Sequence, residues 1–217
     1  MPEELRAAAR ELQEQCQCQG VKIGWTAPQN LHFTLKFLGD TDAEAMPRLT
    51  QVAEEVARSC PAHEVTVATV GAFPSPRQPR VLWVGCTTGA EQLGQLGTRL
   101  DQALAQAGLG PGERRGFVPH LTLGRVRGGH DFAELAAHLE RLADSVLGDM
   151  PVDHFALMQS NLRPGQPPLY VELARLDLPP DEGRGQPGQG LDLLRGQAGS
   201  ACNLAEGRDG CGRRQGQ

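Results

Sequence analysis

Two short segments of the chain carry a histidine and a threonine at the same spacing. In "NLHFTLKFLGD" the pair is His32 and Thr34, and in "PHLTLGRVR" it is His120 and Thr122, 88 residues further along. Random placement of this chain's residues predicts roughly 0.04 matches to the pattern His-x-Thr-Leu. One copy alone would more often be a strand with a structural histidine. Two copies indicate one site built from two segments.

The strand period determines how such side chains are arranged. Both segments alternate apolar and polar residues, which predicts β-strands, and side chains two positions apart in a strand point to the same face. His32, Thr34 and Lys36 are therefore expected on one face, and His120 and Thr122 on one face of the second strand. The intervening apolar residues are expected to pack behind them. Two such strands would form a symmetric cradle for a tetrahedral anion.

Two histidines beside a phosphate can divide general-base and general-acid work. One imidazole takes a proton from an attacking water, and the other gives a proton to the departing oxygen. An ordinary imidazole titrates near pH ~6.5, so the two rings can hold opposite protonation states near neutrality. Threonine hydroxyls can donate to the phosphate oxygens where negative charge develops. This chemistry requires no metal and no cofactor, and no P-loop, HExxH or GxSxG pattern is present.

Further side chains near the motifs have two interpretations each. Arg125 follows Thr122 by three residues, so strict alternation places it on the opposite face, although it lies near the strand end; it is either a phosphate ligand or a surface ion-pair partner. Lys36 is either a third member of the site or a solvated lysine at a strand edge. Phe73 and Trp83 are interpreted as core residues in preference to base-stacking platforms.

Composition limits the classes of protein. A formal net charge of −5 argues against a protein that holds long nucleic acid by bulk electrostatics, but it allows a short nucleotide in a locally basic cleft. No apolar run approaches the ~18 residues of a membrane span, and the amphipathic N-terminus lacks the apolar region of a signal peptide. The six cysteines contain no CxxC pair. We therefore expect reduced thiols, no metal site and a cytoplasmic protein.

The pattern of elements predicts an α+β fold. Amphipathic or helix-forming stretches alternate with pairs of β-branched or apolar runs, which favours mainly antiparallel sheets with helices packed outside. The expected helices are 3–18, 42–60, 90–108 and 131–147. The expected strands are 21–26, 31–38, 64–73, 80–88, 117–126, 152–161 and 168–178. The repetition of the His-x-Thr-Leu pattern suggests two similar lobes.

The chain changes character after Leu178. The remaining residues are rich in Gly, Gln and Arg, with scattered apolar side chains. Such a composition cannot bury enough apolar surface to offset the cost of ordering the chain. We therefore predict one two-lobed domain over 1–178 and a disordered tail over 179–217.

The two motifs and their surroundings resemble a known family. "PQNLHFTLKFLGD", "VGAFPSPRQPRVLWVG" and "FVPHLTLGRVR", with the closing "LMQSNLRPGQPPLYVELARLDL", are similar to bacterial RNA 2′,3′-cyclic phosphodiesterases, also called 2′-5′ RNA ligases, of the two-histidine (2H) phosphoesterase superfamily. The resemblance covers residue 2 to about residue 178. It implies a bilobal α+β fold in which two antiparallel sheets flank a central cleft. Members usually begin with a hydrophobic strand before the first helix, whereas here Met1 directly precedes the helix.

The resemblance also implies a reaction and its residues. The expected reaction is metal-independent opening of a 2′,3′-cyclic phosphate at an RNA 3′ end, or on a small nucleotide, to a 2′-phosphomonoester. His32 is expected to protonate the leaving oxygen and His120 to accept a proton from water, while Thr34, Thr122 and Arg125 hold the phosphate. Alternatives are 2′-5′ ligation through the same residues and a non-catalytic module that binds RNA ends. We expect a monomer without a membrane partner.

Overall fold

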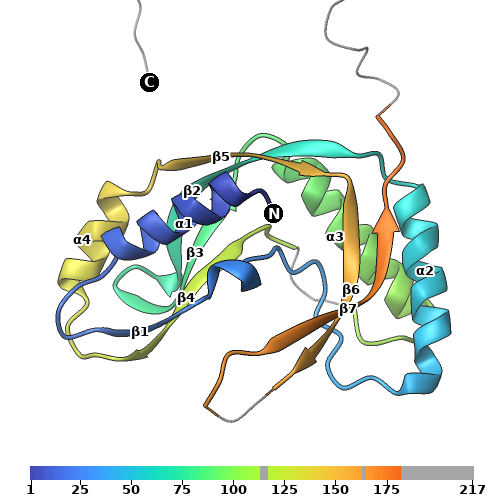
Figure 1. Ribbon diagram of the computed structural model, residues 1–217, viewed down its shortest axis with the longest axis horizontal. Coiled ribbons are helices and arrows are strands. Elements are labelled where there is room, and N and C mark those ends of the chain that lie inside the picture. Colours follow the sequence, from blue (N-terminus) through green and yellow to red (C-terminus); the bar gives the residue numbers. More distant parts are fainter. Residues whose placement is uncertain (113–116, 163–164, 182–217) are drawn as a thin grey trace, which may run out of the picture. The chain divides into compact units, whose positions relative to one another are not determined.

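The computed structural model describes residues 1–112, 117–162 and 165–181 (Figure 1). The helices are α1 (Glu3–Gln15), α2 (Met46–Arg58), α3 (Ala90–Gln106) and α4 (Ala133–Arg141), with single 3-10 turns η1 (Pro28–Asn30) and η2 (Ala43–Ala45). The strands are β1 (Lys22–Trp25), β2 (His63–Ser75), β3 (Gln78–Cys86), β4 (Leu121–Gly128), β5 (Val146–Val152), β6 (His154–Asn161) and β7 (Leu169–Asp177). The predicted tail, apart from 179–181, lies outside the described residues.

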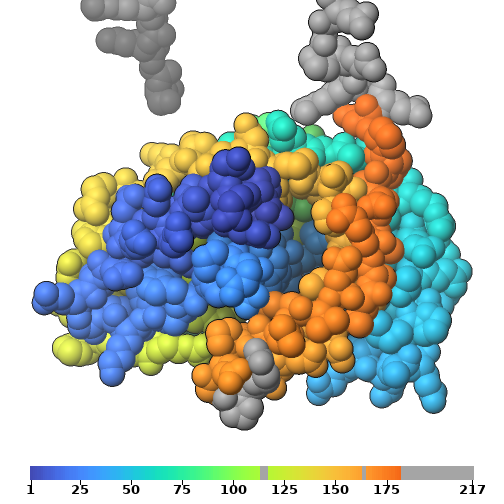
Figure 2. Space-filling view, viewed as in Figure 1, coloured from blue at the N-terminus to red at the C-terminus, as the bar shows by residue number. Residues whose placement is uncertain are grey.

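Two antiparallel sheets form the framework. The larger sheet has the strand order β1-β4-β3-β2-β5, and β6 and β7 form a separate hairpin. Every pairing within both sheets is antiparallel. The prediction of an α+β fold with two mainly antiparallel sheets is therefore confirmed. Figure 2 shows the surface hollowed between α1 and β7.

Helix α1 packs on the larger sheet through one apolar stripe. Leu5, Ala9 and Leu12 recur at helical spacing and are at most 4% exposed. Gln13 is also buried, and its amide donates to the carbonyl oxygens of Thr26 at 2.9 Å and Leu123 at 2.8 Å. Because a buried polar group must be hydrogen-bonded, these contacts fix the helix against β4 one residue beyond Thr122.

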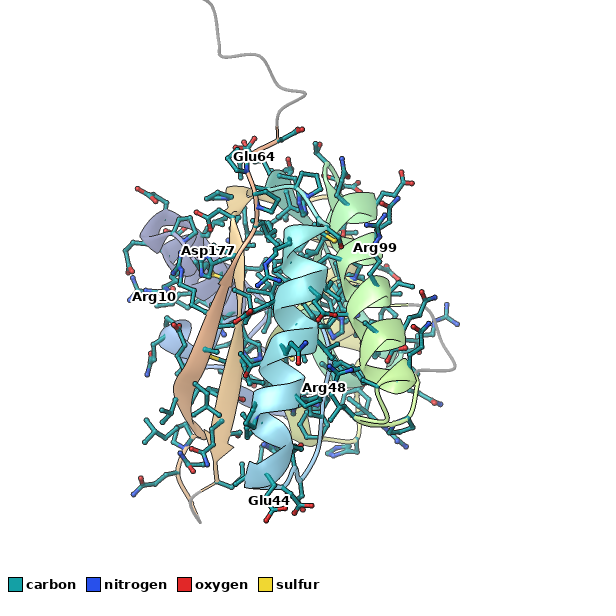
Figure 3. All side chains as sticks on the ribbon, turned by 90° about the vertical axis from the view of Figure 1, so that its right-hand side faces the viewer. Arg10, Glu44, Arg48, Glu64, Arg99 and Asp177 are labelled. Atoms are coloured by element: carbon teal, nitrogen blue, oxygen red, sulfur yellow. The ribbon has the colours of Figure 1, made fainter. Side chains whose placement is uncertain are left out.

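Helices α2 and α3 pack side by side, with β7 on the other side of α2 (Figure 3). Each helix buries an apolar stripe, represented by Leu49 and Val56 in α2 and by Leu96 and Leu104 in α3. Arg99 of α3 donates to the carbonyl oxygen of Ser59, which caps α2, at 3.1 Å. Buried apolar residues from all four helices and both sheets form one continuous core.

Two sequence predictions about elements are wrong. The segment 31–38 forms no regular strand: its one ladder contact is a bridge at Phe33, and Phe37, expected in the core, is 78% exposed. A strand pattern produces a strand only where a neighbouring strand satisfies its backbone groups. The predicted helix 131–147 ends at Arg141, and the residues after it form β5, which pairs with the edge of β2.

Two further observations concern the expected strand before the first helix and the expected lack of a membrane span. Among the described residues no strand precedes α1. None of the helices in that part of the chain is long and apolar enough to cross a membrane.

Candidate active site

A single β-bridge joins the two His-x-Thr segments. Phe33 pairs antiparallel with Leu121, the first residue of β4. In an antiparallel pair the residue after one partner lies beside the residue before the other, with paired Cα atoms roughly 4.5–5.5 Å apart. The bridge therefore places the histidine of each segment beside the threonine of the other.

The same bridge determines which way the polar side chains point. Leu121 is 1% exposed and belongs to the core, and Phe33 is partly buried against that core. Residues on either side of a bridged position point to the opposite face of the sheet. The two histidines and two threonines of the motifs are thus directed away from the core, and all four remain at least partly accessible.

The register of β4 brings Arg125 to the face of Thr122. Thr122 pairs with Trp83 and Arg125 pairs with Val81, two positions along β3, because the register shifts between Leu82 and Trp83. Directly opposed residues of an antiparallel pair share a face, and positions two apart on β3 share a face as well. This β-bulge reverses the expectation from strict alternation, which placed Arg125 on the opposite face.

Each motif histidine is held by a backbone carbonyl two residues before it. Nδ1 of His32 lies 2.7 Å from the carbonyl oxygen of Asn30, and Nδ1 of His120 lies 2.8 Å from that of Val118. A carbonyl oxygen only accepts hydrogen bonds, so Nδ1 carries the proton in both rings. Nε2 is then the atom that accepts a proton in the neutral ring and donates one in the charged ring.

An aromatic ring flanks each of these imidazoles. Tyr170 of β7 meets His32 edge-on, with ring centroids 5.3 Å apart and an interplanar angle of 69°. Phe73 of β2 meets His120 at 5.2 Å and 85°. Both arrangements are in the range of favourable edge-to-face contacts. Each contact limits the rotation of its imidazole on one side.

A second aromatic ring packs against Phe73. Its ring stacks on Trp83 at 5.1 Å and 29°. Trp83 in turn lies across Gly71, where an added Cβ would be 2.4 Å from Cζ2 of the indole. Only glycine leaves room for this stack, and the exposed fraction of Phe73 is 37%. Phe73 and Trp83, interpreted from sequence as core residues, therefore lie on the same face as His120.

Sequence reasoning did not single out Tyr170 or Asn30. Asn30 holds the His32 segment to the second sheet, because its amide donates to the carbonyl oxygen of Pro168 at 3.2 Å. The pattern "PLYVEL" marked a strand, but no local feature of it indicated that the tyrosine would reach His32. Only the pairing of distant segments could reveal these two contacts.

Lys36 is directed toward helix α3. Its ammonium lies 2.6 Å from the carboxylate of Asp101 and 2.9 Å from the carbonyl oxygen of Pro111, and its side chain is 6% exposed. The alternation that placed Lys36 beside His32 and Thr34 does not extend past Thr34, because the chain bends at Leu35. Among the described residues no group of three or more His, Cys, Asp or Glu side chains could hold a metal ion.

Comparison with known proteins decides the family. A family profile described as the 2′-5′ RNA ligase superfamily matches residues 1–163. The chain belongs to the 2′-5′ RNA ligase superfamily. Family membership as predicted from the paired motifs is confirmed.

Two curated members of this superfamily illustrate the similarity. The RNA 2′,3′-cyclic phosphodiesterase of Methanothermobacter thermautotrophicus is 32% identical over 173 residues, which cover 80% of this chain and 92% of the relative. The RNA 2′,3′-cyclic phosphodiesterase of Bacillus subtilis is 30% identical and covers 71% of this chain and 80% of the relative.

Two solved structures share the fold of this chain. The crystal structure of TT0787 of Thermus thermophilus superposes with a TM-score of 0.68 at 29% identity, over 83% of this chain and 95% of that chain. E. coli LigT complexed with 3′-AMP superposes with a TM-score of 0.64 at 25% identity, over 82% and 93% of the two chains. That crystal structure contains LigT together with 3′-AMP.

Proposed function

We propose that this superfamily member is an RNA 2′,3′-cyclic phosphodiesterase that hydrolyses the cyclic phosphate at an RNA 3′ end to a 2′-phosphomonoester. One observation carries the proposal: the bridge between Phe33 and Leu121, which sets two imidazoles and two hydroxyls side by side on one face. Relatives at about 30% identity are named for this activity, and they match most of the chain.

The proposed reaction is an in-line displacement at phosphorus. Water forms a new bond to phosphorus while the bond between phosphorus and O3′ breaks. Nε2 of one histidine takes the proton of the water, and Nε2 of the other gives a proton to O3′. Following the family resemblance, we assign the donor role to His32 and the acceptor role to His120. The carbonyls of Asn30 and Val118 support these roles by keeping the proton on Nδ1 of each ring.

The remaining side chains would stabilise the charge that develops on the phosphate. The hydroxyls of Thr34 and Thr122 can donate to its non-bridging oxygens, and the guanidinium of Arg125 shares the face of Thr122. Because the guanidinium and hydroxyls supply donors on both sides, the mechanism is proposed to run without metal. Lys36 stays a candidate for a supporting role only, since its ammonium contacts Asp101.

The test is hydrolysis of a defined substrate. The full chain is incubated with an oligonucleotide that ends in a 2′,3′-cyclic phosphate, in the presence of a chelator, and products are separated by chromatography. The 2′-phosphate is the expected product. His32→Ala and His120→Ala should each lower kcat by roughly 10²–10⁴-fold. His130→Ala changes an exposed histidine beyond the end of β4 and serves as the matched control.

Three outcomes would contradict the proposal. Tight binding of the oligonucleotide without turnover would favour a module that only binds RNA ends. Joining of the substrate to a fragment with a 5′-hydroxyl, at a rate that exceeds hydrolysis, would favour 2′-5′ ligation through the same residues. Full activity in both alanine variants would exclude the two-histidine mechanism.

A further inference from the structure

A row of positive side chains leads away from the two motifs along β4 and β1. We call Arg125, Arg127 and Lys22 the basic row. Arg125 pairs with Gly24 across the two strands, so the two residues share a face. Lys22 shares that face because it lies two positions from Gly24 on β1. The basic row is therefore on the face that also carries Thr122.

An irregularity in the pairing of β1 with β4 determines the position of Arg127. The register shifts between Lys22 and Ile23, so Arg127 is an extra residue on β4 at that point. Its side chain lies over Gly24: a Cβ added at Gly24 would be 3.0 Å from Nε and 3.5 Å from Cγ of Arg127. Without a side chain, Gly24 leaves space for the arginine to lie flat across β1.

In the part of the chain that the structure describes, the basic row has no acidic partner. Among the described residues, no carboxylate forms an ion pair with any of its three members, although acidic residues outnumber basic ones in the whole chain by 26 to 21. All three side chains are exposed. Unpaired cations that are aligned on one face attract an anion that extends along that face.

The basic row is longer than a single phosphate requires. The register places Arg127 between three and four ladder positions from Thr122, which corresponds to roughly 12 Å at ~3.3 Å per residue. A phosphate held between the histidines and Arg125 would leave Arg127 and Lys22 for other groups. The first other anion in an RNA strand is the phosphate on the 5′ side of the terminal nucleoside.

We propose that Arg127, with Lys22, binds the backbone phosphate on the 5′ side of the cyclic end, so that the preferred substrate is an RNA oligonucleotide and not a free cyclic nucleotide. This inference rests on the proposed function and names its substrate class. A cyclic mononucleotide carries only the phosphate that reacts, and it gains nothing from Arg127. An oligonucleotide gains one charge-assisted contact for each phosphate that the row reaches.

The test compares a trinucleotide that ends in a 2′,3′-cyclic phosphate with 2′,3′-cyclic AMP. The wild-type chain should show a higher kcat/KM for the trinucleotide. Arg127→Gln should reduce the ratio of the two kcat/KM values by about tenfold, whereas Arg127→Lys should keep most of it. Arg48→Gln, on the exposed surface of α2 (Figure 3), is the matched control and should leave the ratio at the wild-type value.

Salt dependence provides a second measurement. Loss of one phosphate contact should make the plot of log(kcat/KM) against log salt shallower by about 0.7 for the trinucleotide. An equal ratio and an equal slope in the wild type and in Arg127→Gln, with both substrates hydrolysed, would overturn this inference and leave the proposed function intact. Absence of turnover of either substrate would overturn the proposed function itself.

Discussion

At the scale of single residues, the two motif histidines have similar surroundings. Both rings have the same backbone anchor on Nδ1 and an aromatic neighbour at nearly the same distance, 5.3 Å for Tyr170 and 5.2 Å for Phe73. The site is close to two-fold symmetric in its histidines. The substrate, which has a leaving oxygen on one side of phosphorus and water on the other, would then assign one ring as acid and the other as base.

This arrangement predicts a bell-shaped dependence of rate on pH. One Nε2 must be free of a proton and the other must carry one, so kcat/KM should rise as the base loses its proton and fall as the acid loses its own. The measurement is kcat/KM of the wild-type chain from pH 5 to pH 9 at constant ionic strength. A flat profile across this range would contradict proton transfer by the two histidines.

At the scale of elements, the His32 segment depends on contacts other than a sheet ladder. Beyond Phe33 it is held by the ion pair between Lys36 and Asp101, whose side chains are 6% and 15% exposed. A buried ion pair adds little over an apolar pair of the same size, but removal of one partner leaves an uncompensated buried charge. The pair thus couples the segment that follows His32 to helix α3.

Asp101→Asn should therefore lower the free energy of unfolding by about 3 kcal/mol. The reason is that the ammonium of Lys36, on a side chain that is 6% exposed, would lose the carboxylate that lies 2.6 Å away. The double change Lys36→Met with Asp101→Leu should recover most of the loss, because it removes both charges. Denaturant unfolding monitored by tryptophan fluorescence measures both. A double variant no more stable than Asp101→Asn would show that the charge is not the cause.

Two glycines of α3, one turn apart, give a matched pair of variants. A Cβ added at Gly94 meets no atom within 4 Å, whereas at Gly97 it would be 2.6 Å from Cδ1 of Phe117. Gly94→Ala should stabilise the fold by about 0.5–1 kcal/mol through helix propensity. Gly97→Ala should destabilise it by about 1–3 kcal/mol through overpacking.

Gly97→Ala should also lower the rate, because Phe117 lies three residues before His120. Thermal unfolding and the hydrolysis assay test both variants. A higher unfolding temperature for Gly97→Ala than for the wild type would contradict the close packing of Phe117 against Gly97.

At the scale of the whole molecule, one continuous core determines stability. Cys16 follows the last residue of α1, is 0% exposed and belongs to this core. Burial, with a smaller contribution from Cys18, raises the pKa of the Cys16 thiol from 9.0 to about 11. A raised pKa means that the folded state holds the proton more tightly than the unfolded state does. The resulting stabilisation is complete below pH 9 and is lost as the pH rises from about 9 to about 11.

Stability of the wild-type chain should therefore decrease by about 1–3 kcal/mol between about pH 8.5 and about pH 11 through this one group. Cys16→Ala removes the titrating thiol and should have a shallower decrease, although its stability at the lower pH is expected to be lower because of the lost volume. Denaturant unfolding at several pH values measures both slopes. Parallel slopes would show that another group causes the alkaline loss.

Several features of the fold and site could be predicted from the sequence. Side chains two apart in an extended chain share a face whatever surrounds them, so the pairing of His32 with Thr34 and of His120 with Thr122 followed from spacing. The presence of the four helices followed from helix-forming residues and apolar residues at helical spacing, although the fourth ends at Arg141 and not at residue 147. Each of these features depends on residues that are only a few positions apart in the chain, so local backbone geometry is enough to predict it.

Only the tertiary structure decided how the parts meet. The bridge at Phe33, the bulge that turns Arg125 toward Thr122, the irregular backbone of 31–38 and the addition of β5 to the sheet all depend on neighbours far away in the chain. Register and strand partners are determined by packing and by backbone hydrogen bonds across the sheet, and these do not appear in local spacing. The sequence by itself determined which groups could do chemistry, and the contacts between distant segments decided which of them face one another.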